Sequence, residues 1–153
     1  MRWKSIPLAT EESIKALTNK LTVPKVIAKL LTQRGITSFE QAKTFFRPEW
    51  SQLHDPFLMQ DMQVAVERIV KAIDQQEKVM IYGDYDVDGT TSVALVTSYF
   101  KDKINSLTPY VPDRYKEGYG ISMSGIDAAK EEGITLIIAL DCGIKAHKQV
   151  IYA

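Results

Sequence analysis

The architecture of this chain follows from the segment Val79-Met-Ile-Tyr-Gly-Asp84-Tyr-Asp86-Val-Asp88-Gly89-Thr-Thr-Ser92. A short apolar run ends at a glycine, and three aspartates then occupy alternate positions before a second glycine and three hydroxyl residues. Carboxylates this close repel one another and raise each other's proton affinity unless a cation neutralises them. The segment therefore predicts a site for a hard metal ion that prefers oxygen ligands.

Short runs rich in β-forming residues alternate with helical patterns from Lys78 onward. Strand, helix, strand, helix and strand in this order predict an α/β fold, in which a parallel sheet with right-handed crossovers carries flanking helices. Ligands of such sheets bind at the carboxyl ends of the strands. The predicted strands span residues 79–82, 107–111 and 135–140, and the predicted helices span residues 91–99 and 122–132, with Ser122 as cap and Gly133 as stop.

A fourth aspartate, Asp141, directly follows the third predicted strand, as Asp84, Asp86 and Asp88 follow the first. If the second strand lies outside the first, the first and third strands are neighbours. All four carboxylates then converge on one edge of the sheet.

A loop rich in tyrosine and glycine follows the second predicted strand, at the same edge of the sheet. Arg114 has the planar fork that matches a phosphate, and Gly118 and Gly120 let the backbone approach a ligand closely. Tyr115 and Tyr119 could stack on a base or a sugar. We expect this loop to bind phosphate, and the alternative is a polar loop whose tyrosines pack in the core.

Short helices are predicted before the α/β pattern begins. Pro24 suits a first helical position, and Gly35 suits a C-terminal stop. Ser38 and Gln41 form a capping-box pattern, and Asp61 can cap the helix that leads into the first strand.

The composition is that of an ordinary globular chain of 153 residues with a net charge of zero. The single Cys142 excludes an internal disulfide, and the longest apolar run, residues 136–140, is too short to span a bilayer. We therefore expect a soluble, cytoplasmic protein without a signal peptide. Residues 1–50 carry nine Lys and Arg against four Asp and Glu, which is either a solvated helical surface or a face that attracts phosphate.

Two other metal or phosphate motifs share part of this pattern. An EF-hand loop needs a bidentate Glu at its twelfth position, where this chain has Leu95, and it follows a helix rather than a strand. Asp86-Val-Asp88-Gly89-Thr90 also resembles the haloacid dehalogenase phosphatase signature, with Asp86 as nucleophile. In that family the strand leads straight into the nucleophile, whereas here Gly83-Asp84-Tyr85 intervenes. A solvated acidic turn is the remaining alternative.

Together these segments resemble the RecJ family of single-stranded-DNA-specific exonucleases, within the DHH phosphoesterase superfamily. Residues 83–92, 111–120 and 141–143 are similar to its first, second and third motifs. The resemblance implies a 5′-to-3′ exonuclease of DNA repair and recombination that releases mononucleotides from single-stranded DNA, using Mn²⁺ or Mg²⁺. A DHH-type phosphoesterase of small nucleotides or pyrophosphate is the alternative within the superfamily.

The resemblance also assigns residue roles. It implies two metal ions held by Asp84, Asp86, Asp88 and Asp141, with Asp141 bridging them, and DNA or its phosphate bound by Arg114, Gly118, Tyr119 and Gly120. Two metal ions can activate a water for in-line phosphoryl displacement without a protein nucleophile.

The Asp-His-His motif that names the superfamily should follow Asp141 by one helix and one strand, and the sequence stops at Ala153. We therefore expect a helical leader at residues 1–60 and a partial DHH-type α/β domain at residues 61–153. We expect these residues alone to bind metal weakly, to leave DNA intact, and to self-associate through an unpaired sheet edge.

Overall fold

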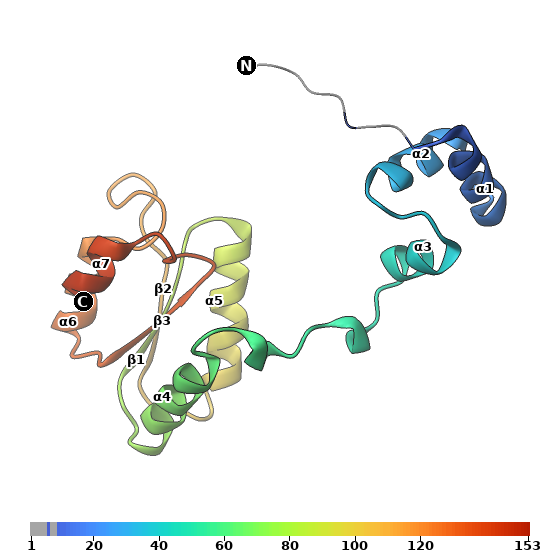
Figure 1. Cartoon of the computed structure of the whole chain (residues 1–153). Helices are drawn as coiled ribbons and strands as arrows, with labels where there is room; N and C mark the ends of the chain where they lie inside the picture. The colour runs from blue at the N-terminus through green and yellow to red at the C-terminus, as the bar shows by residue number, and fades with distance from the viewer. Residues whose placement is uncertain (1–5, 7–8) are drawn as a thin grey trace. The chain divides into compact units, whose positions relative to one another are not determined.

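A computed structural model describes residue 6 and residues 9–153 of the chain. The chain divides into two compact units, Met1–Leu58 and Met59–Ala153, which Figure 1 traces from blue to red. Within the described residues, no helix combines the length and the apolarity needed to cross a lipid bilayer.

The first unit is helical, as the sequence predicts. Its helices are α1 (Glu11–Leu21), α2 (Lys25–Gln33) and α3 (Phe39–Phe46), followed by the short 3₁₀ turns η1 (Trp50–Gln52) and η2 (Pro56–Leu58). Helices α1 and α2 bury a small shared core of aliphatic side chains, namely Ile14, Leu17, Ala28 and Leu31. Burying one such Leu or Ile side chain contributes about 1.5–3 kcal/mol, so this cluster is the main apolar contribution to the unit.

The helix ends of this unit follow the sequence signals closely. The capping box at α3 is confirmed, because the Ser38 hydroxyl accepts the Gln41 amide at 3.1 Å and the Gln41 side chain accepts the Ser38 amide at 3.1 Å. Gly35 has φ +78° just after α2, which is the left-handed geometry that glycine adopts at helix ends. Pro24 is the cap of α2 rather than its first helical residue.

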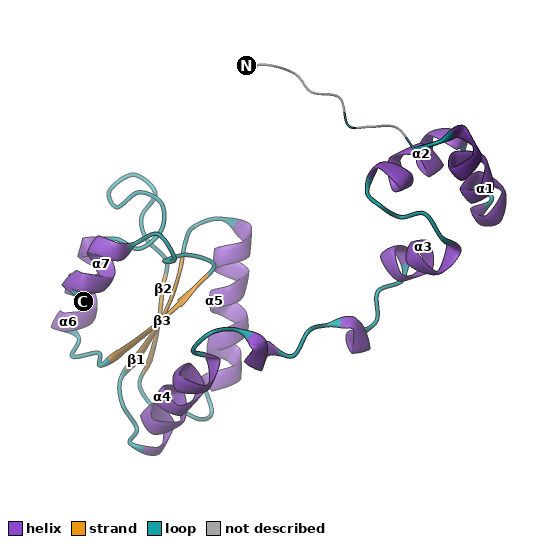
Figure 2. Ribbon diagram, viewed as in Figure 1, coloured by secondary structure: helices purple, strands orange, loops and turns teal. Residues whose placement is uncertain are grey.

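The second unit is the predicted α/β fold, and Figure 2 shows its strands with helices on both sides. Its elements are α4 (Met62–Asp74), β1 (Val79–Gly83), α5 (Val87–Phe100), β2 (Leu107–Tyr110), α6 (Met123–Glu131), β3 (Leu136–Leu140) and α7 (His147–Tyr152). In the described part of the chain, the sheet has three parallel strands in the order β2-β1-β3. The first and third strands are therefore neighbours, which is the arrangement that brings the aspartates after them to one edge.

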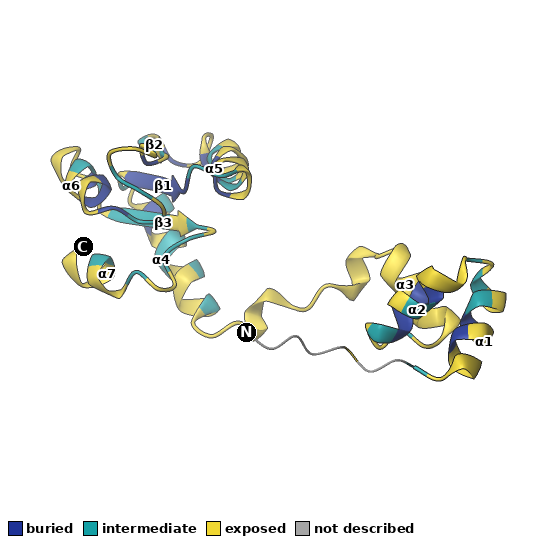
Figure 3. Cartoon of the chain, turned by 90° about the horizontal axis from the view of Figure 1, so that it is seen from above, coloured by how far each residue is buried: buried dark blue, intermediate teal, exposed yellow. Residues whose placement is uncertain are grey.

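Strand β1 is buried along its whole length because it is central and covered on both faces (Figure 3). Val79 and Ile81 face a cluster that includes Ala72 of α4 and Val93 of α5. The alternate residues, Met80 and Tyr82, face Ala129 of α6. This two-sided burial explains why β1 is a continuous apolar run rather than an alternating one.

Two predicted helix starts differ from the structure. Helix α5 begins at Val87, four residues before the predicted Thr91, because the Asp86 side chain accepts the Gly89 amide at 2.9 Å and caps the helix there. Asp61 precedes α4 but has φ +60°, and its side chain makes no capping hydrogen bond. The prediction of an Asp61 side-chain cap was therefore wrong.

Candidate metal centre

Asp84 is the first residue after β1, and its side chain is fully buried. One carboxylate oxygen, Oδ1, accepts a long hydrogen bond of 3.4 Å from the Asp86 amide. The other, Oδ2, has no hydrogen-bond partner among the described residues. A buried carboxylate oxygen without a donor is costly, and a bound cation is the partner that removes this cost.

Asp86 caps α5, and both of its carboxylate oxygens accept hydrogen bonds. Oδ1 accepts the Gly89 amide at 2.9 Å, and Oδ2 accepts the Tyr119 hydroxyl at 2.6 Å. The bond from Gly89, followed by the bond from Tyr119, lowers the pKa of the Asp86 carboxyl. Asp86 is therefore held in its charged form, which is the form that binds a cation.

Asp141 follows β3 and has φ +55°, a left-handed geometry that Asp tolerates better than most residues. One oxygen from each of Asp84, Asp86 and Asp141 lies within 4.8 Å of the others. Desolvation and the negative charges of Asp86, Asp88 and Asp84 raise the pKa of the Asp141 carboxyl. A cation would offset this mutual repulsion, so the donor set fits a divalent ion with oxygen ligands.

Three of the four predicted aspartates therefore lie together, and the fourth, Asp88, lies apart from them. Asp88 lies in the first turn of α5, exposed to solvent, and outside the group of three. It lines an open depression beside that group, together with Val87, Thr91, Ser92 and Asp141. Two of the three hydroxyl residues of the motif, Thr91 and Ser92, therefore lie beside the carboxylate cluster.

Glu117 organises the loop that follows β2, a role that the sequence did not reveal. Its carboxylate accepts the hydroxyls of Ser122 at 2.5 Å and Tyr110 at 2.8 Å, and the amide of Asp113 at 2.7 Å. Although desolvation acts in the opposite sense, these hydrogen bonds hold the pKa of the Glu117 carboxyl below its usual value. Desolvation and the neighbouring Glu117 raise the pKa of the Tyr110 phenol to about 12.

The predicted phosphate-binding residues lie on the outside of this loop. The Arg114 guanidinium is exposed and lies over the Tyr85 ring, 4.6 Å from its centroid. Tyr85 in turn contacts Tyr119 edge to face, with ring centroids 5.3 Å apart. Gly118 and Gly120 have φ +82° and +83°, a geometry that a side chain would strain. The Arg114 guanidinium and two aromatic rings therefore lie beside the carboxylate group.

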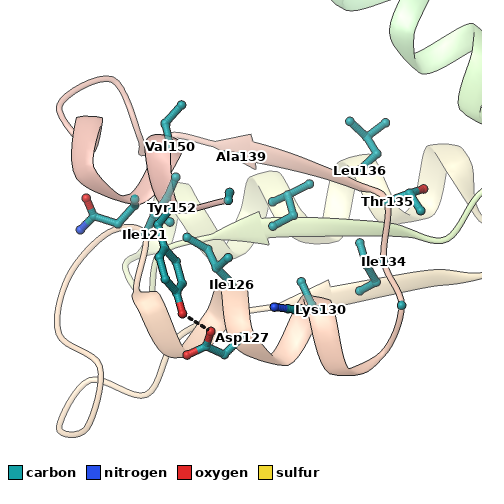
Figure 4. A pocket seen from close by; sticks show the side chains of 15 residues that line it. Ile121, Ile126, Asp127, Lys130, Ile134, Thr135, Leu136, Ala139, Val150 and Tyr152 are labelled. Atoms are coloured by element: carbon teal, nitrogen blue, oxygen red, sulfur yellow. Dashed lines mark hydrogen bonds between the residues drawn. The ribbon is translucent and has the colours of Figure 1, made fainter.

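A larger groove lies elsewhere in this unit, between α6, β3 and α7, with a volume of about 720 Å³. Figure 4 shows that isoleucine, leucine and valine side chains line it, and that the Tyr152 hydroxyl bonds Asp127 across one end, at 2.7 Å. None of the four aspartates of the motifs contributes to this lining. Its apolar walls suit a packed polypeptide better than a phosphate.

Comparison with known proteins places the motifs in a family. Residues 78–153 match the model of the DHH family, N-terminal domain. The chain is 41% identical over 146 residues to the single-stranded-DNA-specific exonuclease RecJ of Bacillus subtilis, a match that covers 95% of this chain and 18% of that protein. The corresponding exonuclease of Escherichia coli is 31% identical over 134 residues, with 86% of this chain and 22% of that protein covered. The chain thus spans about a fifth of the length of these relatives.

Two solved structures of RecJ exonucleases also resemble this chain. An exonuclease RecJ bound to manganese superposes with a TM-score of 0.54 at 27% identity, over 61% of this chain and 24% of that one. RecJ of Thermus thermophilus in complex with Mn²⁺ has a TM-score of 0.63 at 22% identity, over 97% of this chain and 20% of that one, and supports the fold. The predicted resemblance is confirmed, and this chain, through residues 78–153, belongs to the DHH family.

Proposed function

We propose that this chain carries one side of the metal site of a single-stranded-DNA exonuclease that acts from the 5′ end. The observation that carries the proposal is the group of Asp84, Asp86 and Asp141, which each bring one oxygen within 4.8 Å of the others. Asp84 adds a buried oxygen, Oδ2, that has no hydrogen-bond partner among the described residues. The relatives named as single-stranded-DNA-specific exonucleases, and a solved exonuclease RecJ bound to manganese, support the same chemistry.

Asp84, Asp86 and Asp141 would hold a Mn²⁺ or Mg²⁺ ion, and Asp88 at the rim would contribute to a second. Bound there, such ions activate a water and stabilise the charge that develops on the phosphate in an in-line displacement. The residues of the chain do the positioning. Arg114 would bind a backbone phosphate through its fork, and the loop at Gly118 and Gly120 would bring main chain close to the DNA.

Single-stranded DNA is the proposed substrate, rather than a small nucleotide or pyrophosphate. The exposed Arg114 on Tyr85 and the neighbouring Tyr119 form a charged and aromatic surface beside the carboxylates, which suits a strand with bases and phosphates. The phosphatase alternative would need Asp86 as a free nucleophile. Its capping bond to Gly89 and its bond from Tyr119 argue against that role.

Metal binding tests this proposal most simply. Calorimetric titration with Mn²⁺ should give measurable binding to the chain and much weaker binding to Asp141→Asn. Asp102→Asn removes an exposed carboxyl from the turn that follows α5 and should bind as the unchanged chain does. Equal affinity for Asp141→Asn would count against the site. In the Bacillus subtilis exonuclease RecJ, a relative of this chain, an excess of mononucleotide should compete poorly with labelled single-stranded DNA.

For the 153 residues alone, the proposal is weak metal binding without digestion of DNA. Asp141 and Asp88 are exposed, so the ion would lie at an open face, where water competes strongly for it. Mn²⁺-dependent release of nucleotides from single-stranded DNA by these residues would contradict this. The free Cys142 supports a reducing compartment, and we place the protein in the cytoplasm.

Self-association is a further proposed property of these residues. In the described sheet β3 is an edge strand, and the apolar groove of about 720 Å³ lies alongside it. Unpaired edges with adjacent apolar surface favour pairing with a second chain. Sedimentation over a range of concentrations should reveal dimers, and a monomer throughout would refute the idea.

A further inference from the structure

The Tyr119 hydroxyl lies at the metal centre rather than in the stacking position that its sequence context indicates. It donates to Asp86 Oδ2 at 2.6 Å, across 33 residues of chain. That distance is typical of a strong, charge-assisted bond between a hydroxyl and a carboxylate.

The Asp86 carboxylate therefore accepts hydrogen bonds from two separate elements. The Gly89 amide of α5 holds Oδ1, and the Tyr119 hydroxyl of the loop holds Oδ2. Two bonds from separate elements fix both the rotation and the tilt of the carboxylate plane. Removing either bond leaves the carboxylate free to turn about the other.

The hydroxyl is itself held by a rigid support. Glu117, two residues earlier, ties the loop to Tyr110 of β2 and to Ser122, the cap of α6. The Tyr82 hydroxyl of β1 adds a bond to the Gly120 carbonyl at 3.0 Å, on the other side of Tyr119. The loop is therefore tied to the sheet on both sides of Tyr119.

We infer that Tyr119 is a positioning residue, which orients the Asp86 carboxylate toward Asp84 and Asp141 for metal binding. The inference rests on the metal site proposed above. Each carboxylate oxygen has two lone pairs, so Oδ2 can accept the hydroxyl and still offer a lone pair to an ion. Ligand carboxylates in metal sites are commonly fixed by such outer hydrogen bonds, and losing one weakens metal affinity by about 10–100-fold.

The same loop supplies a matched control. Tyr115 is 94% exposed, and its hydroxyl makes no hydrogen bond to any described residue. Tyr119→Phe and Tyr115→Phe thus remove the same atom from the same loop, and only the first removes a bond to Asp86. Both changes keep the ring, so the edge contact of Tyr119 with Tyr85 is preserved.

The test has one arm without metal and one with Mn²⁺ alone. In the metal-free protein, the NMR resonance of the Gly89 amide should shift in Tyr119→Phe and stay in place in Tyr115→Phe. Gly89 donates to the Asp86 carboxylate, which loses its other hydrogen bond only in Tyr119→Phe. In calorimetric titration, Tyr119→Phe should bind Mn²⁺ about tenfold more weakly or worse, with an unchanged midpoint of thermal unfolding, whereas Tyr115→Phe should bind as the parent does.

An unchanged Gly89 resonance in Tyr119→Phe would overturn the inference. Equal Mn²⁺ binding by Tyr119→Phe would overturn it as well. Tighter binding would show that the Tyr119 hydroxyl competes with the ion for Asp86 and would also overturn it. If the parent chain bound no Mn²⁺, the proposed function would fail. The Gly89 resonance would still decide whether Tyr119 holds the carboxylate.

Discussion

The backbone of Gly89 lies against Asp84, more closely than any side chain at position 89 would allow. A Cβ on Gly89 would lie 2.5 Å from the Asp84 carbonyl oxygen and 2.7 Å from its amide nitrogen, and it would overlap the carboxylate oxygen Oδ1. The first turn of α5 can therefore pass directly over the end of β1 only with glycine at this position. This close approach lets one helix cap, Asp86, and one strand end, Asp84, lie together in the proposed metal centre.

Gly89→Ala should displace Asp84 and loosen the start of α5. Overpacking of a close contact costs about 1–3 kcal/mol, and the contact here is with backbone atoms that cannot rotate away. We expect the free energy of unfolding to fall by about that amount and Mn²⁺ binding to be lost. Chemical denaturation and calorimetry measure the two effects. Ser98→Ala, an exposed position on the same helix, should change neither. A Gly89→Ala protein with parental stability and Mn²⁺ affinity would contradict the contact.

Glu117→Ala should release the loop after β2. The substitution leaves the hydroxyls of Tyr110 and Ser122 and the Asp113 amide without their acceptor. Unsatisfied polar groups of this kind cost about 1–3 kcal/mol, so the midpoint of denaturation should fall clearly. Mn²⁺ affinity should fall as well, since Tyr119 loses its support. Glu131→Ala, which removes an exposed carboxyl from α6, should leave both quantities unchanged.

Stability at acid pH should depend on Glu77. The Arg68 guanidinium donates to its carboxylate at 2.7 Å and 3.2 Å, and the hydrogen bond from Arg68, followed by that from Thr135, lowers the pKa of the Glu77 carboxyl. A carboxyl whose pKa is lower in the folded state stabilises the fold above its unfolded pKa of about 4.3, and this contribution is lost as the pH falls toward the folded pKa.

The difference in unfolding free energy between the parent and Glu77→Gln should therefore be largest near neutral pH and shrink below about pH 4.3. Denaturant titrations at several pH values measure it, with Glu131→Gln as the matched exposed control. A difference that stays constant with pH would show that the ion pair contributes nothing through charge.

The strands and the helical first unit could be predicted because they depend on local patterns, whereas the order of the strands entered only as a condition. The apolar runs at β1 and β3 and the capping box at Ser38 each carry their signal within a few residues. The early start of α5 could not be predicted in this way, because Asp, Gly and Thr are as typical of turns as of a capped first turn. The prediction that the Asp61 side chain caps α4 failed because its backbone adopts φ +60°.

The candidate site also has a part that the sequence predicts and a part that it does not. The convergence of Asp84, Asp86 and Asp141 could be predicted on the condition that the first and third strands are neighbours, and the order β2-β1-β3 meets that condition. The bond from Tyr119 to Asp86 and the anchoring of the loop by Glu117 depend on packing between separate elements, and no periodicity reports such contacts. The same holds for the tight fit of Gly89 over Asp84, which becomes visible only in three dimensions.

Asp84→Asn, with and without Mn²⁺, shows directly whether the buried Asp84 carboxylate binds a cation. Substitution removes a buried charge whose Oδ2 has no described partner, so the metal-free variant should be at least as stable as the parent. Mn²⁺ at about a hundredfold its dissociation constant should stabilise the parent by about 2.7 kcal/mol, and should leave Asp84→Asn unaffected. Asp102→Asn should respond as the parent does. Equal stabilisation of Asp84→Asn by Mn²⁺, or a large loss of its metal-free stability, would contradict the account.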